Sequence, residues 1–371
     1  MAETGIAVSF TGVRRPFQLR EYPVAEPGPG AVLVKVMMAN VCGSDLHIWR
    51  GEYDLSRGEP EPYSRAIGHE MLGVVHRLGE GVSSDSAGKP LAVGDRVVYR
   101  YFVPCGVCRA CRRQTTPRCP RGLRHRHPPE VAPHFNAAYG QFFYLHPGTT
   151  IFKVPGNVTD DMAGPANCAL SQVIHGFERA GTRMGDHVVV QGCGGLGINA
   201  IAVAKEIGVA QVIAIDAFDD RLQLARDFGA NELIDLREYP TADARVRRVK
   251  ELTDDWGADV VMELAGHPRV IPEGIAMLGQ GGTYVEIGNI NQKLSIDFDP
   301  STIVHGGKSI LGIMWYDADS LLKALDFLCT RQHKYPFQRV LSHKYPLRAI
   351  DQAFRDQDAG RIHRAALLPW E

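Results

Sequence analysis

The spacing of hydrophobic and polar positions changes near residue 165. Before this point, short apolar runs alternate with turn residues, and they are GAVLVKVMMANVC (30–42), HEMLGVVHRLG (69–79) and VGDRVVYRYF (93–102). Apolar runs of this length, bounded by glycine and proline, predict β-strands. Residues 1–165 are therefore expected to form a β-rich domain.

After residue 165, expected strands and helices alternate along the chain. Strands are expected at 186–192, 211–216, 232–235, 259–266 and 282–288, with a sixth at 309–314. Helices are expected between them at 197–208, 219–229, 242–257 and 269–279. This alternation predicts βαβ units around a parallel sheet. Apolar spacing over 320–328 and 349–360 predicts two further helices, which we expect to pack on the first domain.

Length and charge add limits on domain number and partners. A chain of 371 residues is long enough for two domains. The formal net charge of −1 gives no overall reason to expect nucleic acid or a membrane surface as partner. Neither a secretory signal nor an apolar run of about 18 residues is present. A cytoplasmic protein without a membrane span is therefore expected.

A glycine-rich turn follows the first strand of the alternating region. VVVQGCGGLGINA (188–200) contains Gly192, Gly194 and Gly197 in the spacing of a dinucleotide-binding loop. In such loops, the glycines permit a tight turn, close approach of the backbone to a pyrophosphate, and close packing of helix on strand. The expected cofactor contacts are Gly192, Gly194, Gly195, Leu196, Gly197, Asp216, Arg221 and Gly288.

Asp216 bears on the choice of cofactor. It ends the next expected strand, about 20 residues beyond the turn, where an acid accepts hydrogen bonds from the adenosine ribose. A carboxylate there would repel a 2′-phosphate, and Asp219 and Asp220 follow closely, with Arg221 as the nearest basic residue. The pattern therefore favours NAD over NADP. A structural turn with an incidental aspartate remains the alternative.

Four of the eight cysteines form a cluster with the spacing C-x2-C-x2-C-x7-C. They are Cys105, Cys108, Cys111 and Cys119. Clustered cysteines in a chain without a secretion signal are more often metal ligands than disulfide partners. Four thiolates saturate a tetrahedral Zn²⁺, so we expect a structural zinc lobe over about residues 100–122. A redox-active CxxC pair is the alternative.

The same region is rich in arginine. Between Asp95 and Glu130 the sequence has no acidic residue and nine arginines. Five of them, Arg109, Arg112, Arg113, Arg118 and Arg121, are expected to offset the thiolate charge and donate to the sulfurs. The remaining four, Arg96, Arg100, Arg124 and Arg126, suggest an anionic substrate that bears phosphate, phosphonate or carboxylate.

Three further residues are isolated in the sequence but form a coherent ligand set. Cys42, His69 and Cys168 would each be taken, alone, as buried structural residues. Together they offer two thiolates and one imidazole, which would leave the fourth position of a zinc ion open to water or substrate.

The chain resembles the zinc-containing medium-chain alcohol dehydrogenases over essentially its full length. The resemblance is carried by CGSDLH, GHE, the four-cysteine lobe, GCGGLG with its following aspartate, and the order of the domains. It implies an α/β protein with a GroES-like β-rich catalytic domain (1–165 and 310–371) and a Rossmann doubly wound parallel-sheet domain (166–309). It also implies hydride transfer between NAD and a primary or secondary alcohol or its carbonyl product. Two zinc ions per chain, one catalytic and one structural, and a homodimer or homotetramer are implied as well.

Specific roles also follow from the resemblance. Cys42, His69 and Cys168 match the ligands of the catalytic zinc. Glu70 matches an acid that can approach the metal, and Asp45 matches the carboxylate that orients the histidine ligand.

Three more residues match family positions outside the ligand set. Ser44 and His47 match the inner and outer positions of a proton relay, and Arg364 matches a basic residue on the cofactor pyrophosphate. Two rival functions stay open: a polyol or sugar-alcohol dehydrogenase of the same family, and a zinc-stabilised binding protein that senses NADH. The second rival, with a cysteine–arginine lobe on nucleic acid, fits poorly with a pI near 6.9.

Overall fold

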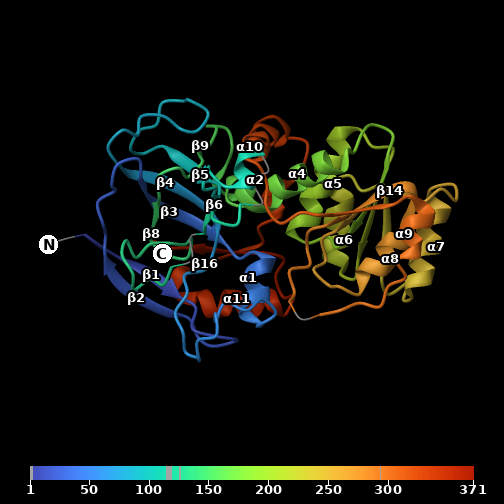
Figure 1. The fold of residues 1–371 in the computed structure, drawn as a ribbon, viewed down its shortest axis with the longest axis horizontal. Helices are drawn as coiled ribbons and strands as arrows, with labels where there is room; N and C mark the ends of the chain where they lie inside the picture. The colour runs from blue at the N-terminus through green and yellow to red at the C-terminus, as the bar shows by residue number, and fades with distance from the viewer. Residues whose placement is uncertain (1–2, 114–118, 125–126, 293) are drawn as a thin grey trace. The chain divides into compact units, whose positions relative to one another are not determined.

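The structure is a computed structural model that describes residues 3–113, 119–124, 127–292 and 294–371 (Figure 1). It divides into two compact units. Unit 1 comprises Met1–Cys168, Asp317–Gln332 and Phe337–Glu371, and unit 2 comprises Ala169–Tyr316 and His333–Pro336. The domain boundaries expected at 165/166 and 309/310 lie a few residues before these divisions.

Unit 2 is built on a parallel β-sheet. Its strands are β10 His187–Gln191, β11 Gln211–Asp216, β12 Glu232–Asp235, β13 Ala258–Glu263, β14 Leu278–Glu286 and β15 Ser309–Gly312. Among the described residues the sheet has six strands in the order β12-β11-β10-β13-β14-β15, and all neighbours are parallel. This is the strand order of a doubly wound nucleotide-binding sheet. The predicted strands and the α/β fold class are confirmed.

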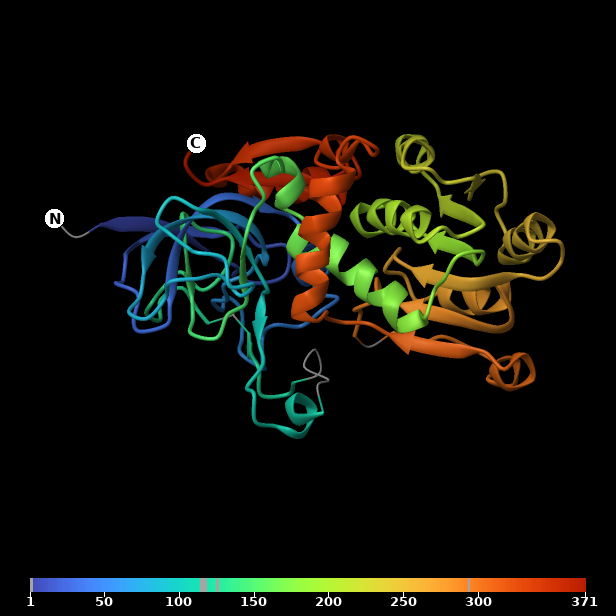
Figure 2. The ribbon, with the colours of Figure 1, turned by 90° about the horizontal axis from the view of Figure 1, so that it is seen from above.

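Helices cover both faces of this sheet. They are α4 Ser171–Ala180, α5 Gly195–Ile207, α6 Asp219–Asp227, α7 Ala242–Leu252, α8 Val270–Met277 and α9 Ser301–Gly306. Helices α5 and α6 pack on one face, and α7 and α8 pack on the other (Figures 1 and 2). Val189, Ile213 and Val261, from three neighbouring strands, are fully buried in the core of the unit. Strands buried on both faces explain the nearly continuous apolar runs in the sequence.

Unit 1 contains a mixed, largely antiparallel sheet. Its order is β16-β17-β3-β4-β5-β9, with β8 also paired to β3. Two smaller two-stranded sheets, β1-β2 and β6-β7, complete the strands of the described part of this unit. The bounds are β1 Thr4–Ser9, β2 Gln18–Pro23, β3 Val32–Asn40, β4 Glu70–Leu78, β5 Arg96–Tyr99, β6 Phe102–Val103, β7 Leu123–Arg124, β8 Phe142–Leu145, β9 Ile151–Lys153, β16 His343–Pro346 and β17 Ala365–Leu368.

One predicted strand of unit 1 is divided. The run at 93–102 forms β5 and β6 rather than one strand. The reason is pairing: β5 lies between β4 and β9, whereas β6 pairs with β7. The separate β6-β7 pair belongs to a lobe that projects from the sheet of the same unit (Figure 2, teal).

Short helices connect the strands of unit 1. They are α1 Gly43–Trp49, α2 Arg109–Arg112, α3 Asp160–Ala163, a π-helical turn at Ala166–Leu170, α10 Ala318–Arg331, α11 Ile350–Asp358, and 3-10 turns at Phe337–Arg339 and Leu347–Ala349. The two helices expected at 320–328 and 349–360 are confirmed as α10 and α11, and both belong to unit 1.

In the part of the chain that the structure describes, no helix is long and apolar enough to cross a membrane.

Candidate active site

Cys42, His69 and Cys168 come together in unit 1 from three distant segments. Cys42 directly precedes α1, His69 directly precedes β4, and Cys168 lies in the π-helical turn. Cys42 Sγ is 3.8 Å from Cys168 Sγ, and His69 Nε2 is 3.3 Å from the same sulfur. Single π-helical turns often occur at functional sites, where they redirect one side chain.

These separations fit a tetrahedral zinc site. With Zn–S bonds of about 2.3 Å, two sulfurs on one tetrahedral zinc lie about 3.8 Å apart. The ligand atoms of Cys42, His69, Glu70 and Cys168 all lie within 4.8 Å of one another. Two thiols, an imidazole and a nearby carboxylate are the donor set that zinc takes in proteins.

The pKa values of Cys42, His69 and Cys168 are also shifted by their mutual contacts. A hydrogen bond from Cys168 is the largest cause that lowers the pKa of the Cys42 thiol, and the same interaction raises the pKa of Cys168. Burial lowers the pKa of His69, but the charges of Asp45 and Cys42 outweigh it and hold that pKa well above its usual value. One thiol is thus prone to ionise beside a positively charged ring. A bound metal would replace that proton as the positive charge.

Glu70 and Arg364 form a buried ion pair next to the ligand set. Burial raises the pKa of Glu70 to about 8, although Arg364 acts in the opposite direction. Oε1 of Glu70 and Nε of Arg364 have no hydrogen-bond partner among the described residues. Buried polar atoms of this kind are costly unless a ligand satisfies them. The structure thus places Arg364 beside Glu70, and its contact with a cofactor pyrophosphate stays a prediction.

Asp45 lies where the resemblance implies. Its Oδ1 is 3.6 Å from His69 Nδ1, and its Oδ2 accepts a hydrogen bond from the backbone N–H of Cys42 at 3.0 Å. Asp45 therefore faces the ring nitrogen of His69 that points away from the thiols. A carboxylate in this position fixes the tautomer and the orientation of a histidine ligand.

The relay candidates lie on α1. Ser44 lies in the first turn, two residues after Cys42, and His47 follows one turn later on the same side of the helix. Both side chains are half-buried. His47 Nδ1 is 2.5 Å from Oε2 of Glu52, a residue that the sequence did not single out. The sequence feature that could have indicated this residue is an acid three positions after the end of α1, the helix that carries both relay candidates.

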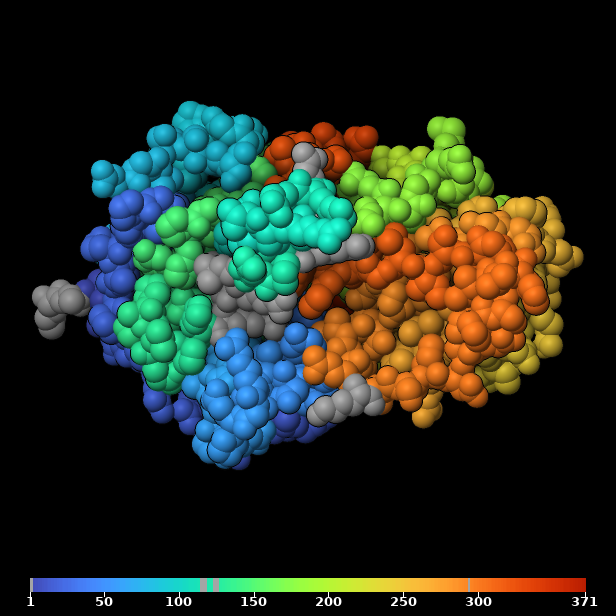
Figure 3. Space-filling model, viewed as in Figure 1, coloured from blue at the N-terminus to red at the C-terminus, as the bar shows by residue number. Residues whose placement is uncertain are grey.

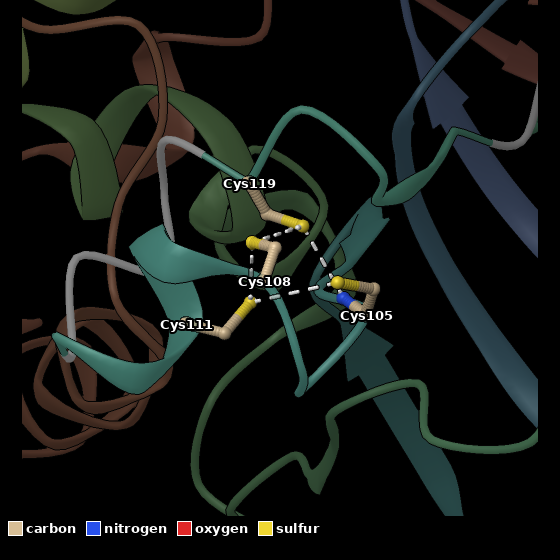
Figure 4. A group of neighbouring side chains, drawn as sticks. All are labelled: Cys105, Cys108, Cys111 and Cys119. Carbon is tan, nitrogen blue, oxygen red and sulfur yellow. Dashed lines mark hydrogen bonds between the residues drawn. The ribbon is translucent and has the colours of Figure 1, made fainter.

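The four clustered cysteines surround one point in the projecting lobe. Their side chains point toward one another from α2 and the loops on either side of it (Figure 4). Cys105 Sγ and Cys108 Sγ lie 4.0 and 3.5 Å from Cys111 Sγ, and Cys119 Sγ is 3.7 Å from Cys108 Sγ. The four sulfurs therefore also fit a tetrahedral zinc, and each cysteine is free of disulfide bonds. Figure 3 shows this lobe, in teal, at the surface of unit 1.

Backbone groups provide the hydrogen bonds that favour ionised thiols in the lobe. N–H groups of Val107 and Cys108 lower the pKa of Cys105 to about 6. The N–H of Cys111 likewise lowers the pKa of Cys108, whereas burial raises the pKa of Cys111 to about 12. An amide donor does not depend on a side-chain rotamer, so this stabilisation is built into the turn itself.

The arginines of this region fall into separate groups. Arg109, Arg112, Arg113 and Arg121 have exposed side chains around the cysteines. Arg96 binds Asp160 at 2.5 Å, and Arg100 is buried with its guanidinium over the Phe102 ring. Arg118 and Arg126 lie outside the described residues, as does the side chain of Arg124.

The glycine-rich turn in unit 2 has the backbone of an anion-binding loop. A side chain at Gly197 would lie 1.9 Å from the carbonyl oxygen of Gly192, so only glycine permits this packing of α5 on the turn. At Gly194, which caps α5, a Cβ would meet no other atom within 4 Å, so the space beside this glycine is open. Gly195 and Leu196 begin the helix, whose N-terminal N–H groups and dipole favour a phosphate.

Asp216 is held firmly at the end of β11. Its carboxylate accepts hydrogen bonds from the backbone N–H groups of Cys193, Ala217 and Phe218. Arg221 lies 3.9 Å from this carboxylate and stacks on the Phe218 ring. The acid is therefore linked directly to the glycine-rich turn.

Two other positions complete the description of unit 2. Gly288 follows β14, and a side chain there would lie 2.7 Å from the backbone nitrogen of Gly266. Arg237 was not anticipated from the sequence, and it binds both Asp219 and Asp235. A cation that binds the Asp219 carboxylate therefore comes from the segment just after β12.

Comparison with known proteins identifies the family. Residues 28–156 match a profile described as alcohol dehydrogenase GroES-like domain, and residues 195–330 match one described as zinc-binding dehydrogenase. A 5-exo-hydroxycamphor dehydrogenase from Pseudomonas putida is 31% identical over 92% of this chain and 92% of its own length. An L-threonine 3-dehydrogenase from Bacillus subtilis is 29% identical over 95% of this chain and 94% of its own length.

Solved structures agree with these sequence matches. An alcohol dehydrogenase from Thermotoga maritima superimposes with a TM-score of 0.90 at 25% identity, covering 99% of this chain and all of that one. An alcohol dehydrogenase from a Thermus species gives a TM-score of 0.84 at 26% identity, covering 98% of this chain and 99% of its own. These relatives are enzymes, which favours an enzyme over an NADH-sensing binding protein. The chain is an oxidoreductase that belongs to the zinc-containing medium-chain alcohol dehydrogenase family.

Proposed function

We propose that the protein oxidises a secondary alcohol to a ketone with NAD, and catalyses the reverse reaction, at a zinc ion held by Cys42, His69 and Cys168. Unit 1 is the catalytic domain in this proposal and unit 2 the cofactor domain. The four clustered cysteines hold a second, structural zinc. The 5-exo-hydroxycamphor dehydrogenase and the L-threonine 3-dehydrogenase are each named for a compound with a secondary hydroxyl group, which supports this choice over a primary alcohol.

The convergence of Cys42, His69 and Cys168 carries the proposal. Three residues from distant segments lie within one metal-binding sphere, whereas each alone would be an ordinary core residue. Zinc bound there would supply Lewis-acid polarisation of the substrate oxygen. Three protein ligands leave one position of a four-coordinate zinc open, as catalytic sites require.

The residues of α1 are assigned to proton transfer. Ser44 takes the proton of the substrate hydroxyl, and His47, one turn later, passes it toward Glu52 and solvent. Glu52 supports this assignment because a carboxylate at Nδ1 leaves Nε2 as the proton-accepting atom of the ring. Asp45 holds His69, and the Glu70–Arg364 pair places an unsatisfied carboxylate oxygen next to the metal ligands.

NAD rather than NADP is proposed as the cofactor. The carboxylate of Asp216 accepts three backbone hydrogen bonds, which hold it at the end of β11, where it would repel a 2′-phosphate. The arginines that could reverse this preference are already paired: Arg221 lies beside Asp216, and Arg237 binds Asp219 and Asp235.

A homodimer or homotetramer is proposed as the assembly. Strand β15 lies at the edge of the unit 2 sheet, and its Ile310 is 47% exposed. Val304 and Met314, on either side of this strand in sequence, are 78% and 50% exposed. An exposed apolar edge strand is a pairing surface, and two copies related by a twofold axis would cover it. A cytoplasmic location remains our prediction from the sequence.

Removal of single ligands tests the proposed site. Cys42→Ala and His69→Ala should each lower the zinc content from two ions to one per chain and abolish NAD reduction. Binding of NADH, followed by its fluorescence, should stay close to that of the unchanged protein because unit 2 is intact. Turnover that survives either substitution would exclude this site. A screen of alcohols by NADH absorbance, including polyols and phosphorylated compounds, would then identify the substrate.

An anionic substrate is the second candidate, and it rests on the excess of arginine between Asp95 and Glu130. Of the four arginines that suggested it, Arg96 is paired with Asp160 and Arg100 is buried over the Phe102 ring. An anionic alcohol and its neutral isostere should differ in kcat/KM, and the difference should shrink as salt screens the charges. Equal kcat/KM values at all ionic strengths would remove this candidate and leave the neutral secondary alcohol.

A further inference from the structure

We propose that Tyr139 is a positioning residue of the catalytic zinc site, and that it holds Asp45 and Gly68 so that His69 presents Nε2 to the metal. The inference rests on the proposed ligand set of Cys42, His69 and Cys168. It assigns a role to a side chain in NAAYGQFFYLH (136–146), a segment whose aromatic residues look like ordinary core from the sequence.

The hydroxyl group of Tyr139 completes the hydrogen bonding of Asp45. It donates to Asp45 Oδ2 at 2.8 Å, and it lies 3.3 Å from the carbonyl oxygen of Asn40. The same Oδ2 accepts from the backbone N–H of Cys42 at 3.0 Å. Rotation of the carboxylate would break both hydrogen bonds to Oδ2, and in the bonded arrangement Oδ1 lies 3.6 Å from Nδ1 of His69.

The ring and backbone of this segment also fix the chain just before His69. Gly68 has a φ of +91°, and a Cβ there would lie 2.7 Å from the Tyr139 ring. The neighbouring N–H of Ala138 donates to the carbonyl oxygen of Gly68 at 3.0 Å. One short segment therefore holds both the carboxylate and the backbone that determine where His69 points.

Burial makes this arrangement rigid. Tyr139 is 2% exposed, and its ring packs edge-on against Phe354 with centroids 5.9 Å apart. Burial and the charge of Asp45 raise the pKa of the hydroxyl well above its usual value, so it remains a donor. A buried hydrogen bond from a neutral hydroxyl to a carboxylate is among the stronger kinds.

The consequence is control over the histidine tautomer. Asp45 Oδ1 facing Nδ1 favours the ring form with its proton on Nδ1, which leaves the lone pair of Nε2 for zinc. Without the Tyr139 hydroxyl, Oδ2 of Asp45 keeps only the Cys42 N–H as donor, so the carboxylate can turn and His69 loses its fixed partner. The loss should appear as weaker zinc binding at this site alone.

Zinc release tests the proposal without a turnover assay. In Tyr139→Phe, transfer of the catalytic zinc to a chromogenic chelator should be about tenfold faster, whereas release of the structural zinc should not change. The matched control is Tyr345→Phe, which removes a hydroxyl that donates to Asp356 Oδ2 at 2.9 Å in the same unit. Cys42→Ala should bind one zinc ion fewer. The phase of zinc release that is absent in this variant is therefore the release of the catalytic zinc.

The outcomes separate the possible failures. Equal release from Tyr139→Phe and Tyr345→Phe would overturn the positioning role while the proposed site stands. Faster release of both zinc ions would also overturn it, because it would indicate general destabilisation. Unchanged zinc content in Cys42→Ala would refute the ligand set and this inference with it.

A double-mutant cycle tests whether the effect passes through Asp45. Asp45→Asn and Asp45→Asn/Tyr139→Phe should release the catalytic zinc at the same rate if Tyr139 acts only through that carboxylate. Additive effects of the two substitutions would contradict the proposed route.

Discussion

Nδ1 of His47 lies 2.5 Å from Oε2 of Glu52, and this pair closes the C-terminal end of α1. The backbone N–H of Glu52 donates to the carbonyl oxygen of His47 at 2.9 Å, so chain and side chain meet at the same residue. Arg50 also approaches Glu52 and binds Asp358 of α11 at 2.5 Å. The histidine thus has an acidic partner that is itself held by the backbone of His47 and approached by Arg50.

Glu52→Gln should slow proton transfer without affecting zinc. The amide cannot balance the charge that His47 acquires, so we expect kcat/KM to fall by about tenfold. Addition of imidazole as a proton acceptor should restore part of the rate. Glu80→Gln, at an exposed carboxylate of the same unit, is the control and should match the unchanged enzyme. Full activity of Glu52→Gln would show that the pair is structural only.

Cys111→Ser should remove the structural zinc and destabilise the lobe. Metal content should fall from two ions to one, and the melting temperature should drop by several degrees because metal binding contributes folding free energy. Cys329→Ser is the matched control, since Cys329 lies away from both cysteine groups and donates to Asn157. Atomic absorption and thermal melting would give the two values. Two zinc ions in Cys111→Ser would show that the four sulfurs do not form one site.

Asp216→Asn should weaken the preference for NAD. The substitution removes the negative charge that opposes a 2′-phosphate, so the ratio of kcat/KM for NAD to that for NADP should fall by about tenfold or more. Asp227→Asn, at an exposed aspartate at the end of α6, should leave the ratio unchanged. The ratio is measured with both cofactors at a constant alcohol concentration. An unaltered ratio in Asp216→Asn would place the discrimination elsewhere.

The free energy of unfolding should decrease as the pH rises from mildly acidic to mildly alkaline, because two acidic residues are buried next to each other. Glu263 and Glu286 face each other in register on β13 and β14. The carboxylate of Glu263 accepts hydrogen bonds from the N–H groups of Gly266 and Asn289, whereas the oxygens of Glu286 have no such partner among the described residues. Burial, followed by the charge of Glu263, raises the pKa of Glu286 to about 8.

The sign of this effect follows from proton linkage. The folded protein keeps the Glu286 proton up to about pH 8, but the unfolded chain releases it near the ordinary value of 4.5. The free energy of unfolding should therefore decrease by up to about 1.4 kcal/mol per pH unit between these values and level off above them. Glu286→Gln should flatten this decrease in thermal melting from pH 5 to 9, and the exposed Glu238→Gln should not. The same slope in both variants would contradict the assignment.

Local patterns in the sequence predicted much of this protein. Runs of apolar residues indicated the strands of the unit 2 sheet, most clearly the central strands β10, β11 and β13, which are almost fully buried and therefore apolar along their length. The glycine-rich turn and the C-x2-C-x2-C-x7-C spacing lie within single short segments, so their geometry depends on neighbouring residues. Cys42, His69 and Cys168 form a coherent donor set by residue type, but no local rule joins residues so far apart, and their match to catalytic zinc ligands follows from the family resemblance.

Long-range packing decided the remainder. Tyr139 reaches Asp45, Arg364 pairs with Glu70, and Glu286 lies beside Glu263, yet nothing in the sequence around any of these residues names its partner. Each contact depends on strand order, register and the direction in which a buried side chain points. The sequence determines which segments are strands, helices and ligand-bearing turns, because those choices follow from local conformational preference and burial. Only the tertiary structure determines which buried polar groups satisfy one another, because that depends on how segments distant in the chain pack together.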